Sequence, residues 1–291
     1  MSQLKIFIQL TRLNRPIGYM LLFWPCSWGL SLALLHHDTD FSKFFYYLIL
    51  FFLGSLLMRS AGCIVNDIVD KDIDLKVSRT KDRPLPSGKT TVMNAMIYVI
   101  ILCLIAFFIL IQFNKFTIIL GLGSMIFAFS YPFMKRITYW PQLFLGLTFN
   151  WGIVMAWTSI TNDISSEILL LYFSAIFWTL GYDTIYGAQD IKDDEIIGVK
   201  STSIKFKSHM KLFVSLCYLI SICLLIFLFK NNMGFNLFTL FLLFFVMSLI
   251  FQIKIFSEKK PKSCLLAFKL NNLSGLILFF GILTLSNKII L

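Results

Sequence analysis

An acidic segment, NDIVDKDID, directly follows a long apolar run of this sequence. Asn66, Asp70 and Asp74 stand four residues apart in it, and Asp67 lies next to Asn66. On a helix, residues at i, i+4 and i+8 form one stripe, so these oxygen-bearing side chains would face the same way. Like charges stacked in a stripe repel one another and destabilise the helix. The spacing therefore indicates that a cation is bound there.

A second segment, DTIYGAQDIKDD, follows another apolar run and repeats this spacing. Tyr186, Asp190 and Asp194 again stand at i, i+4 and i+8, and Asp183 precedes Asp190 by seven residues on the same helical face. Two segments that obey one spacing rule also suggest a duplicated unit of four helices.

Oxygen ligands from two facing helices, with basic residues close by, are typical of a site where Mg²⁺ bridges a polyphosphate. Magnesium takes one or two carboxylates per ion and completes its octahedron with phosphate oxygens and water. Arg79 and Arg83 follow the first segment and Lys200 follows the second, and such cations can hold the remaining phosphate charge. The alternative is that both segments are ordinary solvated loops. Two clusters in the same register favour the metal site.

The elements that position these segments are apolar runs. The chain has 291 residues, of which 58% are hydrophobic, so it carries more apolar surface than one soluble core could use. Runs long enough to cross a hydrocarbon core of ~30 Å lie at residues 17–35, 44–65, 92–113, 116–133, 141–160, 166–182, 211–229, 235–256 and 264–285. The sequence predicts an all-α polytopic membrane protein with nine transmembrane helices, organised as a single domain over residues 1–291.

The basic residues predict the orientation of these helices. Only Lys43, Lys115, Lys230 and Lys288 fall on the side of the odd-numbered connections. By the positive-inside rule, the N-terminus and both acidic segments face the cytoplasm, or the matrix in an organelle. The net charge of +11 is then explained by topology and an anionic lipid surface, and it needs no nucleic-acid partner.

Both acidic segments resemble motifs of the UbiA superfamily of intramembrane prenyltransferases. NDIVDKDID is similar to the motif NDxxDxxxD, and DTIYGAQDIKDD is similar to DxxYxxxDxxxD. Further segments resemble the 4-hydroxybenzoate polyprenyltransferase branch, namely RLNRPIG (12–18), RSAGC (59–63), RPLPSG (83–88), YPFMKR (131–136), PQLFLG (141–146) and GVKST (198–202). One departure is Lys207, which stands in IKFKS where that branch is expected to have glycine.

The resemblance implies a bundle of nine transmembrane helices around a central cavity. The implied reaction is Mg²⁺-dependent transfer of a polyprenyl group from polyprenyl diphosphate to the ring carbon ortho to the hydroxyl of 4-hydroxybenzoate, in ubiquinone biosynthesis. The implied ligands of Mg²⁺ and its diphosphate are Asn66, Asp70, Asp74, Asp190 and Asp194.

The remaining site residues divide into three groups. Candidates for catalytic roles are Asp183, Tyr186 and Asp67, with Asp183 expected to orient the phenol or remove a proton and Asp67 expected to support the metal site. Diphosphate-binding candidates are Arg79, Arg83 and Lys200. Candidates near the aromatic acceptor are Arg15 or Arg136, either of which could hold its carboxylate, and Tyr131, whose ring could stabilise an allylic cation as that of Tyr186 could.

Two other functions remain open at this point. An enzyme of the same superfamily could use another acceptor, such as a dihydroxynaphthoate, chlorophyllide, haem or geranylgeranylglyceryl phosphate. An ion-coupled transporter also carries intramembrane carboxylates, but its site usually lies near the midplane, and these carboxylates fall at helix ends. We expect a multi-pass protein of the bacterial inner membrane, because the sequence shows no Arg/Ser-rich transit extension of the kind that a mitochondrial protein carries.

Overall fold

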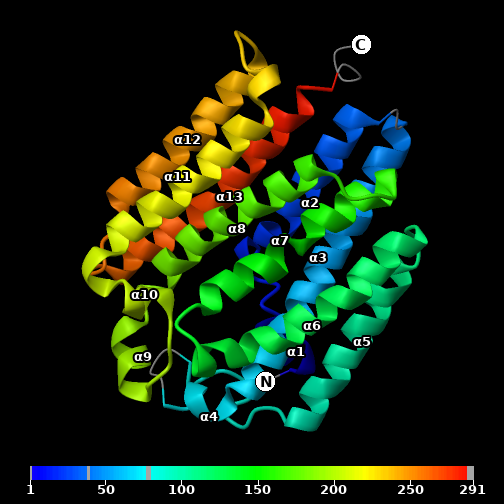
Figure 1. Cartoon of the computed structure of the whole chain (residues 1–291). Coiled ribbons are helices and arrows are strands. Elements are labelled where there is room, and N and C mark those ends of the chain that lie inside the picture. Colours follow the sequence, from blue (N-terminus) through cyan, green and yellow to red (C-terminus); the bar gives the residue numbers. More distant parts are fainter. Residues whose placement is uncertain (1, 38–39, 77–79, 287–291) are drawn as a thin grey trace.

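The computed structural model describes residues 2–37, 40–76 and 80–286, and all regular secondary structure in these ranges is helical (Figure 1). Nine helices in the described residues are long and apolar enough to cross a membrane, so the predicted number of spans is confirmed. They are α2 (Ile17–His36), α3 (Phe41–Val69), α5 (Val92–Leu110), α6 (Lys115–Ile137), α7 (Pro141–Thr161), α8 (Ser166–Gly187), α11 (Met210–Leu228), α12 (Leu237–Ile255) and α13 (Pro261–Leu283). Short helices connect them, namely α1 (Gln3–Thr11), α4 (Lys71–Asp74), α9 (Ile191–Ile197), α10 (Thr202–Lys205), η1 (Lys207–His209) and η2 (Lys230–Asn232).

The two halves of the bundle have matching neighbours. In the first half α2 packs on α3 and α3 packs on α5; in the second half α7 packs on α8 and α8 packs on α11. The halves meet where α2 packs on α7, and α13 closes the bundle against α2 and α8. This correspondence agrees with the expected duplication of a four-helix unit.

Helices α1, α4, α9 and α10 gather at one end of the bundle, which we call the polar end (Figure 1, lower part). The acidic segments lie there, because α3 and α8 both run toward this end before α4 and α9 begin. Lys207, which stands where glycine was expected, begins η1 and forms an ion pair of 2.7 Å with Glu195.

Helix α1 was not predicted from the sequence. It buries Ile6 and Leu10 against Ile64 of α3 and its neighbours. The helix ends at Arg12, whose φ of 55° is left-handed and turns the chain back toward α3. A helix of this length is too short to span a membrane and is unstable alone, so its packing on α3 holds it in place.

A hydrogen-bonded network fixes α8 within the second half of the bundle. Trp178 of α8 donates its indole N–H to Asn271 Oδ1 of α13 at 2.8 Å, and Asn271 donates to Gln252 Oε1 of α12 at 2.9 Å. Tyr218 of α11 donates to the same oxygen of Gln252 at 2.8 Å. Such interhelical hydrogen bonds join helices that share no hydrophobic driving force in lipid. They hold rigid the helix that carries the second acidic segment.

The contact between α2 and α7 predicts a stability effect at Gly29. A Cβ added there would lie 2.4 Å from the backbone oxygen of Ile153, so Gly29→Ala must push α2 and α7 apart. We expect this variant to lose about 1–3 kcal/mol of stability, as overpacked cores do. Gly123→Ala on α6 is the matched control, because a Cβ there meets nothing within 4 Å. Thermal unfolding in detergent measures both, and equal midpoints for the two variants would contradict this account of the contact.

Candidate functional site

A cavity of about 690 Å³ extends from the polar end into the bundle. Its walls include the oxygen-bearing residues of both acidic segments, namely Asn66, Asp70, Asp74, Asp183, Asp190 and Asp194. Tyr131, Tyr186, Lys200, Arg83 and Arg15 also line it. The structure therefore brings together two segments that are far apart in the sequence.

Neither acidic segment is one continuous helix. Helix α3 ends at Val69, and Asp70 has φ −97° and ψ 6°, so the chain turns there before α4 begins. Asp190 has φ −109° and ψ 4° and occupies the same place before α9. The expected straight stripe is thus bent at its middle carboxylate in both segments. Aspartate favours such positions because its side chain competes with the helical backbone.

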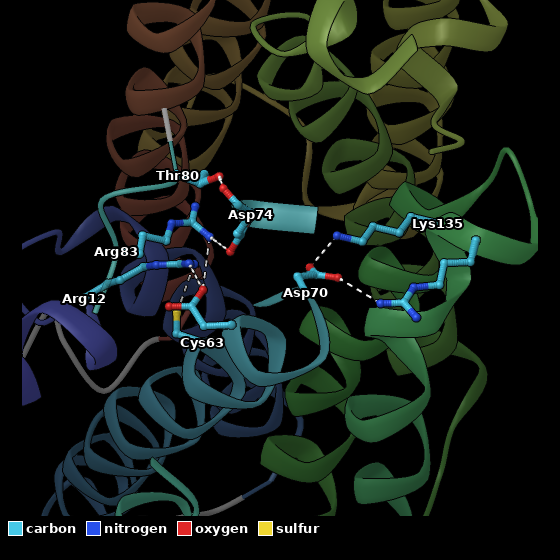
Figure 2. A network of polar contacts seen from close by, with 9 residues as sticks. Arg12, Cys63, Asp70, Asp74, Thr80, Arg83 and Lys135 are labelled. Atoms are coloured by element: carbon cyan, nitrogen blue, oxygen red, sulfur yellow. Dashed lines mark hydrogen bonds and ion pairs between the residues drawn. The ribbon is translucent and has the colours of Figure 1, made fainter. Parts of the chain in front are cut away.

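Asp70 is the carboxylate at the first bend, and two basic residues approach it (Figure 2). Lys135 of α6 forms an ion pair with Asp70 Oδ2, and Arg136 Nη2 lies 3.6 Å from Oδ1. Oδ1 is nevertheless buried without a hydrogen-bond partner. Burial raises the pKa of the Asp70 carboxyl, and the charge of Lys135 opposes this shift. An oxygen with unused acceptor capacity, held near cations, is suited to receive a metal ion.

A second group of ion pairs surrounds Asp67, and Figure 2 labels its partners Arg12 and Arg83. Arg12 Nη2 lies 2.5 Å from Asp67 Oδ1, and Arg83 Nη1 lies 3.1 Å from the same oxygen. Arg83 Nη1 also contacts Asp74 Oδ2 at 2.7 Å, and Arg12 Nη1 lies 3.6 Å from Cys63 Sγ. Both arginines line the cavity, whereas Asp67 is 1% exposed and lies behind its wall.

Arg59 lies deeper, on the face of α3 that also carries Asn66, and both residues line the cavity. Its guanidinium is 5.3 Å from the ring centroid of Phe149, and its Nε is buried without a hydrogen-bond partner. A Cβ on Gly18 would lie 2.9 Å from this Nε, so the glycine leaves room for the guanidinium. Asp183 of α8 lines the same cavity. A cation inside the membrane-spanning region without a close anion is costly, and this points to an anionic ligand.

Some of the other predicted site residues line the cavity and others do not. Lys200 lines the cavity and donates to the carbonyl of Ile137 at 3.1 Å. The ring of Tyr186 packs against that of Phe268 at an angle of 40°, with ring centroids 4.5 Å apart. Arg136 is not part of the cavity lining and donates to the carbonyl of Val69 at 2.7 Å. Arg79 lies outside the described residues.

Sequence reasoning assigned no role to Arg12, Arg59 or Lys135, although the structure places all three at the cavity. Arg59 carried a usable signal, because a lone charge within an apolar run is rare and usually functional. Arg12 and Lys135 carried none, because basic residues near helix ends follow from the positive-inside rule alone.

The donor set fits Mg²⁺ that is shared with a phosphate ligand. Among the described residues, no three His, Cys, Asp or Glu side chains are grouped closely enough to hold a metal by themselves. Mg²⁺ is usually bound by one or two carboxylates and substrate phosphates, so it needs no closed cage of protein ligands. Asp70 Oδ1 and the other acidic residues of the wall provide such partial sites.

Comparison with known proteins finds a family profile and individual relatives that match this sequence. A sequence profile of the UbiA prenyltransferase family matches residues 22–273. The 4-hydroxybenzoate octaprenyltransferase of Vibrio vulnificus is 38% identical over 96% of this chain and 96% of its own length. The mitochondrial 4-hydroxybenzoate polyprenyltransferase of Arabidopsis thaliana is 45% identical over 74% of this chain, but the match spans only 52% of that protein.

Solved structures share the fold. A UbiA homologue from Aeropyrum pernix K1, in its apo form, superposes with a TM-score of 0.76 at 23% identity and covers 91% of this chain and 97% of its own. A UbiA homologue from Archaeoglobus fulgidus bound to GPP and Mg²⁺ gives a TM-score of 0.71 at 15% identity, over 96% of this chain and 99% of its own.

Proposed function

This chain belongs to the UbiA prenyltransferase family, and on that basis we propose that it transfers a polyprenyl group from polyprenyl diphosphate to 4-hydroxybenzoate, ortho to the hydroxyl. The observation that carries the proposal is the meeting of both acidic segments at one cavity, in a chain with full-length relatives that are named for this activity. Because the chain belongs to a prenyltransferase family, we no longer consider that it is an ion-coupled transporter.

Mg²⁺ would be held by Asn66, Asp70, Asp190 and Asp194, with Asp74 beside them. The support is the orphaned Asp70 Oδ1, the position of all five residues in the cavity wall, and the binding of Mg²⁺ with GPP by the Archaeoglobus homologue. When bound, the ion supplies a Lewis acid that stabilises negative charge on the departing diphosphate.

Basic side chains of the wall would stabilise the same charge. Lys135, Arg83 and Lys200 line the cavity near the carboxylates, and their donors can reach phosphate oxygens that the metal leaves free. In the transfer, the allylic C–O bond breaks and its electron pair leaves with the diphosphate. The ring carbon of the acceptor then forms the new C–C bond, and the ring proton passes to a base.

The acceptor requires a cation for its carboxylate, and we assign this role to Arg59. Its guanidinium, whose Nε has no hydrogen-bond partner, lies at the cavity, whereas Arg15 is exposed at the mouth and Arg136 lies outside the lining. Asp183 also lines this cavity. It is the candidate to orient the phenol and to accept its proton while the carboxylate is held at the other end of the ring.

The apolar walls of the cavity suit the reaction. Water consumes an allylic cation, so the site must exclude it while the acceptor is already in position. Tyr131 and Tyr186 line the cavity and can stabilise the cation through their ring faces. We place the protein in the bacterial inner membrane with the polar end on the cytoplasmic side, which the distribution of basic residues supports.

The first test is the reaction itself with purified protein in detergent or lipid. Radiolabelled 4-hydroxybenzoate and a polyprenyl diphosphate should give prenylated product with Mg²⁺, and excess EDTA should abolish the product until Mg²⁺ is restored. Dihydroxynaphthoate and geranylgeranylglyceryl phosphate are offered in parallel. Product from either of these, with none from 4-hydroxybenzoate, would reassign the acceptor within the family.

A further inference from the structure

Two arginines that line the cavity share a carboxylate that does not line it. Asp67 Oδ1 contacts Arg12 Nη2 at 2.5 Å and Arg83 Nη1 at 3.1 Å. Figure 2 shows the two guanidinium groups side by side, with Arg12 arriving from α1 and Arg83 from the connection that follows α4. One buried anion therefore holds two cations that come from different parts of the chain.

We propose that Asp67 is a positioning residue that directs Arg12 and Arg83 toward the diphosphate, and that Arg12 is a further diphosphate-binding residue. This inference rests on the proposed function, since it takes the diphosphate as the anion that enters the cavity. It differs from the expectation that Asp67 supports the metal site.

The position of Asp67 favours anchoring over metal binding. Its side chain is 1% exposed and does not line the cavity. A metal ion that bound Asp67 Oδ1 would have to displace two charged donors and lose some of its own water, and Mg²⁺ dehydrates reluctantly. Removing one partner of a buried ion pair leaves an uncompensated charge, so the two arginines and Asp67 stabilise one another.

Arg83 explains why an anchor outside the cavity is useful. Its Nη1 is shared between Asp67 and Asp74, and Asp74 Oδ2 lies 2.7 Å away in the cavity wall. When Asp74 turns to a metal, the contact with Asp67 remains and keeps the guanidinium at the wall. The planar guanidinium still has donors free for phosphate oxygens.

Arg12 depends on α1 for its position. The left-handed φ of 55° at Arg12 and the packing of Leu10 against α3 bring the side chain to Asp67 and to Cys63. The Arg12 side chain is 22% exposed, and the residue is part of the cavity lining. Helix α1 is therefore part of the diphosphate site and not merely an N-terminal extension.

The test separates metal binding from diphosphate binding and uses no acceptor. Mn²⁺ binding to the whole purified protein is measured by EPR, alone and at saturating pyrophosphate, and pyrophosphate binding is measured by calorimetry with Mn²⁺ present. We expect Asp67→Asn and Arg12→Gln to keep Mn²⁺ affinity within about twofold and to lose about tenfold or more in pyrophosphate affinity. Asp70→Asn should instead lose Mn²⁺ binding.

A double variant tests the shared mechanism. If both residues act through one contact, Asp67→Asn with Arg12→Gln should lose less than the product of the two single losses. Loss of Mn²⁺ affinity in Asp67→Asn that matches Asp70→Asn would make Asp67 a metal ligand and overturn the proposal, as would wild-type pyrophosphate affinity in Arg12→Gln. If Asp67→Asn fails to fold, the pyrophosphate affinity of Arg12→Gln alone decides whether the proposal stands.

The same data distinguish failure of this inference from failure of the proposed function. Wild-type protein that binds neither Mn²⁺ nor pyrophosphate would remove the proposed function and this inference together. Wild-type binding with unaltered variants would remove only the inference. The identity of the acceptor has no influence on either measurement.

Discussion

Replacing Asp70 or Asp190 by alanine is expected to lower kcat for prenyl transfer by about a thousandfold or more, because each variant loses a carboxylate at the centre of the metal site. Both residues line the cavity at the bend of an acidic segment. The loss should not be restored by raising the concentration of 4-hydroxybenzoate. Excess Mg²⁺ should restore it only in part, since the missing ligand weakens metal binding as well.

Matched controls lie in the same segments. Asp72→Ala removes a charge two residues from Asp70, but Asp72 is exposed and not part of the cavity lining. Asp193→Ala is the equivalent control for Asp190, since Asp193 also lies outside the lining. Steady-state kinetics on purified variants with equal thermal midpoints gives the comparison. Activity near the wild-type level in Asp70→Ala or Asp190→Ala, or equal loss in the controls, would refute the assignment of the metal site.

Arg59→Gln is expected to raise KM for 4-hydroxybenzoate by about 100-fold while KM for the prenyl diphosphate changes little. This corresponds to roughly 3 kcal/mol, the usual cost of removing one partner of a desolvated charge pair. Glutamine keeps hydrogen-bonding capacity and fits the space beside Gly18 and Phe149, so the variant tests the charge more than the packing.

The uncharged analogue 4-hydroxybenzamide provides a second test of this role. If Arg59 binds the carboxylate, wild type should discriminate strongly between 4-hydroxybenzoate and 4-hydroxybenzamide, and Arg59→Gln should lose most of that discrimination. Arg15→Gln and Arg136→Gln are measured beside it, because the sequence alone favoured these two arginines. A carboxylate-specific defect in either of them, with none in Arg59→Gln, would return the role to the mouth of the cavity.

The hydropathy of the sequence predicted most of this fold. The nine spans follow from runs of apolar residues, because a bilayer demands about the same length from every crossing helix. Helix α1 was not predicted because it does not cross the membrane and is stabilised by the packing of Ile6 and Leu10 on α3. The bends at Asp70 and Asp190 were not predicted, because i, i+4 spacing fits a straight helix as well as a bent one.

The functional site, like the fold, could be predicted from the sequence only in part. Spacing correctly predicted that Asn66, Asp70, Asp190 and Asp194 would share one space, since repeated charge at helix ends has few structural explanations. The partners of Asp67 could not be predicted, because the pairing of Arg12 with Asp67 depends on how α1 turns back. Such contacts join distant parts of the chain and have no local signature.

The number of crossings has a practical consequence for vesicle experiments. Nine spans place α1 at the polar end and the C-terminal end of α13 at the opposite end of the bundle (Figure 1). A protease-cleavable tag joined directly after Ser286 therefore reports, in sealed proteoliposomes, on the face that lacks the acidic segments. Sorting vesicles by the accessibility of that tag gives two populations of known sidedness. Adding Mg²⁺ and 4-hydroxybenzoate to the outside of each population then shows from which compartment the site is supplied.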